Sequence, residues 1–198
     1  AAGLPPGSNI RGMISFGAYL FAGTNGDGIY QSSDRGNTWA KTDINNSLLA
    51  QQIVFTFCIK GNSLFAGASN GIYKSTDGGA TFLRMVNGFP PDRNVTTFSL
   101  TVSSGNLIAA VAVSLSPSST LNAIFYSSDD GSNWNQANLP VNATFVSSVA
   151  SAGSSIAYAG VHGQSSSVTG LYKSTDACVT WCSETVSLTV EIKRLAAM

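Results

Sequence analysis

Four stretches of this sequence repeat one eight-residue phrase, and that phrase decides the fold. They read Ser32-Ser33-Asp34-Arg35-Gly36-Asn37-Thr38-Trp39, Ser75-Thr76-Asp77-Gly78-Gly79-Ala80-Thr81-Phe82, Ser127-Ser128-Asp129-Asp130-Gly131-Ser132-Asn133-Trp134 and Ser174-Thr175-Asp176-Ala177-Cys178-Val179-Thr180-Trp181. The aspartates stand at positions 34, 77, 129 and 176, so the phrase returns every 43 to 52 residues. A period of this length is typical of propellers, solenoids and other repeat arrays.

The residues around the second phrase show how one repeat folds. Strand-length runs occur at 53–59, 64–67, 72–74 and 82–86, and turns rich in Gly, Asn and Ser separate them. Four short antiparallel strands repeated at this length are the blades of a β-propeller. We therefore predict an all-β propeller of four-stranded antiparallel blades.

The remaining phrases place the other blades. We expect four blades, at about 10–43, 52–88, 95–138 and 145–185. Apolar residues alternate at the start of 186–198, which predicts the first strand of a further blade or a closing strand. Three explanations of the blade count stay open: part of a larger propeller, which we favour, a ring completed by a second copy of the chain, or a closed four-bladed ring.

Composition narrows the function. Ten basic and ten acidic residues among 198 give no net charge, so we expect neither a nucleic-acid nor a membrane partner. One histidine and the three cysteines, Cys58, Cys178 and Cys182, supply no recognisable metal set, and we expect no metal or cofactor. Whether Cys178 and Cys182 form a disulfide stays open at this point.

The repeated phrase has the chemistry of a tight turn. Its Asp can accept backbone N–H bonds, the Ser two residues earlier adds a hydroxyl, and the Gly two residues later permits a positive φ. The closing aromatic residue begins the next strand and covers the junction. We therefore expect a structural role for the residues of the phrase: Ser32, Asp34, Gly36, Trp39, Ser75, Asp77, Gly79, Phe82, Ser127, Asp129, Gly131, Trp134, Ser174, Asp176 and Trp181.

The phrase resembles the Asp box, or bacterial neuraminidase repeat, which lies between the third and fourth strands of a blade. Phe82 replaces the usual Trp, Asn133 replaces Thr, and Cys178 stands where the family has glycine. Because a positive φ is disfavoured outside glycine, we expect the fourth turn to fit the pattern least well. The family includes sialidases, xyloglucan-cleaving endoglucanases, photosystem II assembly factors and sortilin-type receptors, so the fold does not choose the function.

The resemblance implies that the Asp boxes point away from the ligand site. The opposite face is then built by loops within blades and by the junctions between them. These segments are 25–27, 69–70, 114–122 and 161–169, with junctions at 43–52, 87–96 and 137–144. The candidate ligand-binding residues on this face are Asp27, Asp92, Arg93, His162 and Gln164.

The sequence does not contain the catalytic set of a sialidase. That resemblance implies three arginines on the substrate carboxylate and a Tyr–Glu nucleophile pair, but Arg35 lies in an Asp box and Arg84 on an outer strand. The only glutamates, Glu184 and Glu191, are both near the carboxyl end. We therefore assign no catalytic residue.

Other glycoside hydrolases need two carboxylates that flank the scissile bond. Asp27 and Asp92 are the only plausible pair on the ligand face, and turn chemistry explains both. We expect a non-catalytic binding or scaffold propeller that recognises a glycan or a protein and is secreted or extracytoplasmic. We also expect that further blades or a homo-oligomer complete the ring. The alternative is a fragment of a glycoside hydrolase, sialidase-like or xyloglucanase-like, with most catalytic residues outside this chain. An assembly factor that binds a partner protein is a third, weaker reading.

Overall fold

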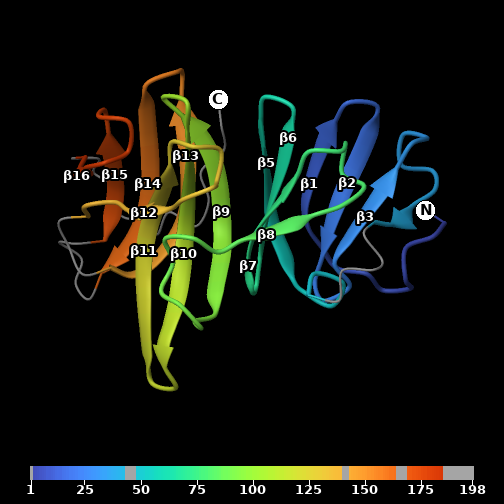
Figure 1. Ribbon diagram of the computed structural model, residues 1–198, viewed down its shortest axis with the longest axis horizontal. Coiled ribbons are helices and arrows are strands. Elements are labelled where there is room, and N and C mark those ends of the chain that lie inside the picture. The colour runs from blue at the N-terminus through green and yellow to red at the C-terminus, as the bar shows by residue number, and fades with distance from the viewer. Residues whose placement is uncertain (1, 43–47, 140–142, 164–168, 185–198) are drawn as a thin grey trace.

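Four antiparallel sheets lie side by side along the molecule (Figure 1). The computed structural model describes residues 2–42, 48–139, 143–163 and 169–184, and the strands below belong to that part of the chain. Blade 1 contains β1 (Ile10–Phe16), β2 (Tyr19–Thr24), β3 (Ile29–Ser32) and β4 (Ala40–Lys41). Blade 2 contains β5 (Val54–Lys60), β6 (Ser63–Ala68), β7 (Gly71–Ser75) and β8 (Leu83–Met85). Blade 3 contains β9 (Val95–Ser103), β10 (Asn106–Ser116), β11 (Ser119–Ser127) and β12 (Asn135–Gln136). Blade 4 contains β13 (Ala143–Ala152), β14 (Ile156–Gly163), β15 (Gly170–Ser174) and β16 (Cys182–Ser183).

Each sheet keeps its strands in chain order, so the first strand forms one edge and the fourth strand forms the other. The first strands of neighbouring blades, β1, β5, β9 and β13, contact one another in succession. This arrangement confirms the all-β fold of four-stranded antiparallel blades. In the described residues, no helix has the length and apolar character needed to cross a membrane. The strand expected within 186–198 lies outside the described residues.

Blade 3 carries a hairpin where a loop is expected. From the sequence we expect a loop at 114–122, and this expectation is wrong, because β10 and β11 stay paired as far as Ser116 and Ser119. Figure 1 shows this hairpin projecting beyond the other blades. Continued pairing satisfies backbone N–H and C=O groups within the sheet. In blade 4, β14 likewise extends through Gly163, and residues 164–168 lie outside the described part.

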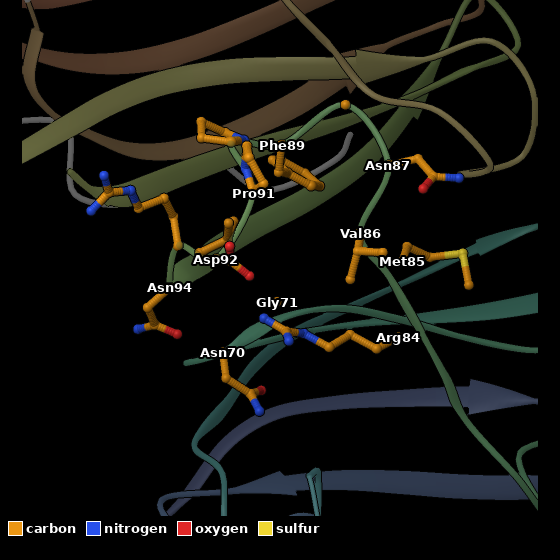
Figure 2. A pocket seen from close by; sticks show the side chains of 14 residues that line it. Asn70, Gly71, Arg84, Met85, Val86, Asn87, Phe89, Pro91, Asp92 and Asn94 are labelled. Carbon is orange, nitrogen blue, oxygen red and sulfur yellow. The ribbon is translucent and has the colours of Figure 1, made fainter.

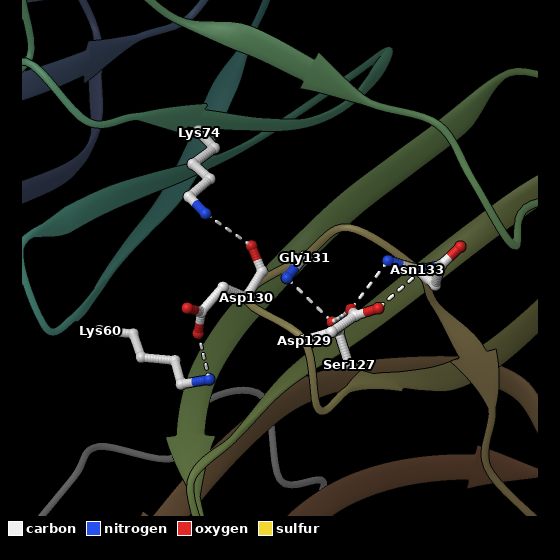
Figure 3. Close-up of polar contacts among 7 residues, drawn as sticks. All are labelled: Lys60, Lys74, Ser127, Asp129, Asp130, Gly131 and Asn133. Carbon is white, nitrogen blue, oxygen red and sulfur yellow. Dashed lines mark hydrogen bonds and ion pairs between the residues drawn. The ribbon is translucent and has the colours of Figure 1, made fainter.

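The Asp boxes form the turns between the third and fourth strands. In blade 3, Ser127 Oγ donates to Asp129 Oδ1 at 2.8 Å and accepts the Gly131 amide at 2.9 Å. The backbone and side-chain amides of Asn133 donate to the two Asp129 oxygens at 2.8 and 2.7 Å (Figure 3). The other three turns form the same bonds, with a threonine hydroxyl in place of the Asn133 side-chain amide.

The fourth turn differs from our expectation. Cys178 adopts a φ of 73° and donates its amide to Ser174 Oγ at 3.1 Å, so it fills the glycine position of the Asp box. The Cys178 side chain is 1% exposed and packs in the cluster that contains Trp181, so burial offsets the unfavourable backbone conformation. Both Cys178 and the exposed Cys182 are free thiols, as is the buried Cys58.

Hydrogen bonds in the turns stabilise the ionised carboxylates. For Asp34 and Asp129, bonds from the residue four positions later are the largest cause, and they lower each pKa to about 2. Burial raises the pKa of Asp77, but the bonds from Thr81 and Ser75 outweigh it and lower the pKa to about 2. The pKa of Asp176 is lowered against burial in the same way.

The segments that lead into blades 1 and 3 have one structure, which we call the inter-blade strap: residues 2–10 and residues 87–95. The two sequences align position by position from Ala2-Gly3-Leu4-Pro5-Pro6 and Asn87-Gly88-Phe89-Pro90-Pro91 onward. The two strap glycines have φ values of 92° and 90°. The residue before each glycine accepts the amide of the box tryptophan, Trp39 at 2.8 Å and Trp134 at 3.0 Å. Trp181 of blade 4 donates to Asn138 in the same way at 3.2 Å. Each of these bonds ties an Asp box to the segment that precedes its blade.

The apolar core lies between blades. Phe65 and Ile72 of blade 2 pack in one cluster with Leu107, Phe125 and Trp134 of blade 3. The next cluster joins residues of blades 3 and 4, among them Ile108, Ile124, Tyr172 and Trp181. Each blade therefore buries its faces against its neighbours, as expected for stacked repeats that cannot bury them alone.

A polar contact adds to this packing at the Asp-box end of blades 2 and 3. The Lys60 ammonium forms an ion pair with the Asp130 carboxylate, and Lys74 Nζ donates to the Asp130 carbonyl at 3.0 Å (Figure 3). Asp130 is the residue after the box aspartate, and its φ of 56° aims it toward blade 2. Because the Asp130 side chain is 60% exposed, we attribute only a small stabilisation to the ion pair.

The strap glycine provides a first test. An ideal Cβ at Gly88 would lie 1.9 Å from the Trp134 carbonyl oxygen, whereas a Cβ at Gly61, also at positive φ, would meet nothing within 4 Å. We predict that Gly88→Ala lowers the free energy of unfolding by more than about 2 kcal/mol. Gly61→Ala should cost about 1 kcal/mol, from backbone conformation alone. Urea denaturation measures both, and equal losses would contradict the strap contact.

The box carboxylates provide a second test. A folded-state pKa below the ordinary 3.8 contributes stability that is complete at higher pH and is lost as the pH falls from about 4 through about 2. We predict that the urea concentration at the unfolding midpoint decreases as the pH is lowered through this window. Thr38→Val, which removes the hydroxyl donor to Asp34, should weaken the dependence. Thr120→Val, at the exposed β11 tip, is the matched control and should leave the dependence unchanged.

Candidate ligand-binding face

The turns of each blade divide between two ends of the molecule. The Asp boxes and the turns between first and second strands share one end, since the strands alternate in direction. The turns between second and third strands lie at the other end, which we call the loop face. Residues 25–28, 69–70 and 117–118 form its turns. The linker 86–94 starts beside the Asp box of blade 3, where Asn87 bonds to Ser132, and reaches this face where Asn94 bonds to Ser69. This is the face that the resemblance to Asp-box proteins implies for ligand binding.

A β-bulge interrupts the first strand of every blade near the loop face. At equivalent positions of the four first strands, one residue has no partner on the second strand: Arg11, Phe55, Phe98 and Ser147. The first strand of blade 4 has a second register shift, at Thr144. Bulges redirect a side chain and occur often beside functional sites. The repeat of the bulge in four blades places four redirected side chains along the innermost strands.

Two of the bulged residues begin a row of aromatic rings. The rings of Phe55 and Phe98 lie 5.4 Å apart, and those of Phe98 and Phe145 lie 4.9 Å apart in an edge-to-face contact. His162 of β14 continues the row, with its ring 6.4 Å from Phe145. These phenylalanines are half-buried, unlike the core aromatics. The row crosses blades 2, 3 and 4 and offers an apolar surface with a polar imidazole at one end.

Polar groups border the row on the side of blade 1. Arg11, the bulged residue of β1, donates from Nε and Nη2 to the side-chain oxygen of Asn25 at 3.0 and 2.9 Å. Arg11 remains exposed, so the bond fixes its direction without removing it from solvent. Asp27 lies in the same turn, where its amide donates to Thr24 Oγ1 at 2.9 Å. This bond fixes the backbone of Asp27 within the turn.

A crevice of about 740 Å³ opens between blades 2 and 3. Its lining includes Asp92 and Arg93, two of the residues expected from the sequence, together with Arg84 of β8 and Asn70 of the β6–β7 turn (Figure 2). Asp92 adopts a φ of 57° at the bend of the linker. The structure thus brings Asp92 and Arg93 to one cavity, while Asp27 lies in blade 1 and His162 in blade 4. Gln164 lies outside the described residues.

The aromatic row is not apparent from the sequence. Phe55 and Phe57 look alike in the apolar run of β5, and only the register shift separates the bulged residue from the one that packs on the core. The sequence predicts an outer strand at Arg84 but gives no sign that this residue also lines a cavity.

The face offers few groups for chemistry. Among the described residues, no group of three or more His, Cys, Asp and Glu side chains could hold a metal ion. Asp130 is paired with Lys60, and Glu184 forms an ion pair with Lys173 at 3.2 Å. The carboxylates that remain on the loop face within the described segments are Asp27 and Asp92, and they belong to different blades. The arrangement is suited to binding by apolar contact, hydrogen bonds and charge.

Comparison with protein families shows the family of this chain. Residues 1–194 match the model of the DUF6242 beta propeller domain. The chain belongs to this family. A search of curated proteins finds no match.

Solved structures share the fold of this DUF6242 propeller. The extracellular domain of the two-component system BT4673 from B. thetaiotaomicron superposes with a TM-score of 0.69 and 18% identity, over 94% of this chain and 24% of that chain. YCF48 bound to D1 peptide gives a TM-score of 0.62 and 15% identity, over 90% and 56%. The GH74 xyloglucanase from Xanthomonas campestris gives 0.60 and 17%, over 84% and 28%. The chain thus spans between about a quarter and just over half of these proteins, and the likeness shows the fold.

A mutational comparison separates the aromatic row from the core. Phe65 is 0% exposed, and we predict that Phe65→Ala lowers the free energy of unfolding by about 3 kcal/mol or more. Phe98→Ala should cost at most about half as much, because its ring is only partly buried among other half-buried rings. Urea denaturation of both variants checks this, and equal losses would make Phe98 a core residue.

Proposed function

We propose that this propeller is a non-catalytic, extracytoplasmic binding module that recognises a glycan or a protein through its loop face. The Asp boxes hold the opposite end of each blade and leave the loop face to the ligand. The proposal concerns this chain and does not extend to any longer protein of which it forms a part.

The aromatic row carries the proposal. Three half-buried phenylalanine rings in mutual contact, at 4.9 and 5.4 Å, form a rigid apolar strip across three blades. Aromatic side chains bury much area with little loss of conformational entropy, and they are enriched at binding sites and interface hot spots. Two of the rings sit at or beside bulges, which turn them out of the alternation that would bury them in the core.

The structural relatives support an extracytoplasmic binding role without deciding it. One is an extracellular domain, and another is described in complex with a peptide. At these identities each relative indicates the fold only, so we infer the ligand of this chain from its own residues.

A part of a glycoside hydrolase is the second candidate, because the GH74 xyloglucanase shares the fold. Catalysis in this chain would rest on Asp27 and Asp92. Asp27 belongs to a turn of blade 1, and Asp92 to the linker between blades 2 and 3. A hydrolase normally places its two carboxylates within about 10 Å on either side of one glycosidic bond. We therefore favour binding.

A screen on immobilised glycans and peptides tests the proposal. We predict that at least one class binds, and that Phe98→Ala weakens binding by tenfold or more, since a central aromatic contact contributes about 1.4 kcal/mol or more. Leu83→Ala is the matched control, because Leu83 is 70% exposed on the outer strand β8, away from the row. It should leave binding unchanged.

Two results would contradict the proposal. One is binding that survives Phe98→Ala in a variant that still folds. The other is hydrolysis of a bound glycan by this chain, which would favour the hydrolase instead.

A further inference from the structure

The crevice between blades 2 and 3 has two well-anchored walls. One is the β6–β7 turn, where Asn70 Nδ2 donates to the Leu48 carbonyl at 2.8 Å and Asn70 Oδ1 accepts Tyr73 Oη–H at 3.0 Å. The other is the linker, where Asn94 Nδ2 donates to the Ser69 carbonyl at 3.0 Å. Phe89 fixes the linker further, because its ring stacks on Trp134 with centroids 5.8 Å apart. The cavity therefore exists before any ligand arrives.

Arg84 reaches into this cavity. Figure 2 shows its side chain extending from β8 so that the guanidinium lies beside Gly71, between Asp92 on one side and Asn70 on the other. An ideal Cβ at Gly71 would be 2.9 Å from Arg84 Nε, so the absence of a side chain there makes room for the guanidinium. Arg84 Nε is buried and has no hydrogen-bond partner within the described part of the chain.

Equivalent positions in other blades show that this arrangement is particular to blade 2. Arg84 lies on the fourth strand of blade 2, opposite Tyr73 of the third strand. The equivalent residue is Lys41 in blade 1, opposite Tyr30, and Gln136 in blade 3, opposite Phe125. Lys41 Nζ donates to the Ala50 carbonyl at 2.7 Å, so its charge is satisfied by its own linker. The corresponding crevice between blades 3 and 4 has about 310 Å³, and none of the described residues that line it is charged.

The charges of the larger crevice favour an anion. Arg84 and Arg93 contribute two positive charges and Asp92 one negative charge. Among the described residues, none of the three forms an ion pair within 4.0 Å. A guanidinium binds a carboxylate through two parallel hydrogen bonds, and such charge-assisted bonds are among the strongest in proteins. Asp92 remains as an acceptor for hydroxyl groups, and Val86 and Pro91 add apolar surface.

The linker wall disfavours an extended peptide. Pro90 and Pro91 have no backbone N–H, so this wall cannot form the donor half of a strand pairing. A sugar needs no such pairing, because its ring presents apolar C–H groups and its hydroxyls bond to side chains. The lining thus provides an arginine for a carboxylate, a carboxylate for hydroxyls and an apolar patch for a ring.

We propose that the crevice between blades 2 and 3 binds a hexuronic acid residue of an acidic glycan, with Arg84 holding the sugar carboxylate. Arg93 strengthens the positive field at the entrance, and Asp92 accepts sugar hydroxyls. The site is separate from the aromatic row and does not need the row to bind a ligand.

Nuclear magnetic resonance titration of the whole chain tests the site. The probes are methyl β-glucuronide, methyl β-glucoside, inorganic phosphate and a tripeptide with a free carboxylate. We predict that the glucuronide shifts the backbone amides of Asn70 and Gly71 and the Arg84 Nε–H, with at least tenfold higher affinity than the neutral glucoside. Such a difference matches the loss of one charge-assisted hydrogen-bonded pair. Arg84→Gln should remove at least nine-tenths of the affinity, and Arg84→Lys should retain part of it, because the charge remains without the two-bond geometry. Lys41→Gln, at the equivalent position of blade 1, should change nothing.

Four outcomes would overturn the proposal. They are equal affinity for the neutral glucoside, tighter binding of phosphate than of the glucuronide, tighter binding of a tripeptide with a free carboxylate, and no shift at Asn70 and Gly71. The last readout uses the unaltered protein, so it stands even if Arg84→Gln fails to fold. Because Phe98→Ala leaves this crevice intact, failure here and failure of the aromatic row as a binding site are separate results.

Discussion

The structure depends on one backbone hydrogen bond that recurs in blades 1, 3 and 4. The amide of the tryptophan that closes an Asp box donates to the carbonyl of a residue in the segment before that blade, at Ala2, Asn87 and Asn138. The box carboxylate fixes the turn by accepting three local hydrogen bonds, and the tryptophan amide then fixes the turn to the incoming chain. Trp134 and Trp181 also fill the clusters between blades, and Trp39 packs with Ala22 and Tyr30 within blade 1. One residue thus joins the turn, the linker and the core, which explains why the phrase ends in an aromatic residue.

The two ends of the molecule differ in how their side chains are engaged. At the Asp-box end, each box carboxylate accepts hydrogen bonds from its own turn. At the loop face the bulges and the linker leave side chains exposed instead. Arg11 and Phe98 are bulged residues of two first strands and Arg84 lies on the fourth strand of blade 2, yet all three reach this end. We therefore expect a ligand to bind at the end of the molecule opposite the Asp boxes.

The sequence predicts the scaffold well, because its determinants are local. The bonds of an Asp box join residues at most four positions apart, so the phrase alone indicates the turn, and even Cys178 fits the pattern. The β10–β11 hairpin was missed because exposed serines in 114–120 resemble a loop, whereas pairing with the facing strand decides the structure. The strap is visible as a repeat of 2–10 in 87–95, but its role depends on a tryptophan more than thirty residues away.

The aromatic row depends on a one-residue shift in strand register, which no single sequence run reveals. Two of the expected site residues, Asp92 and Arg93, do share a cavity, because both belong to one linker.

The central claim is that the loop face, and not the Asp-box end, meets the ligand. Hydrogen–deuterium exchange with and without the strongest ligand from the glycan and peptide screen tests it most directly. The account predicts slower exchange in peptides from β5, β9 and β13 near Phe55, Phe98 and Phe145, with the four Asp-box turns unchanged. Slower exchange confined to the Asp-box turns would contradict it.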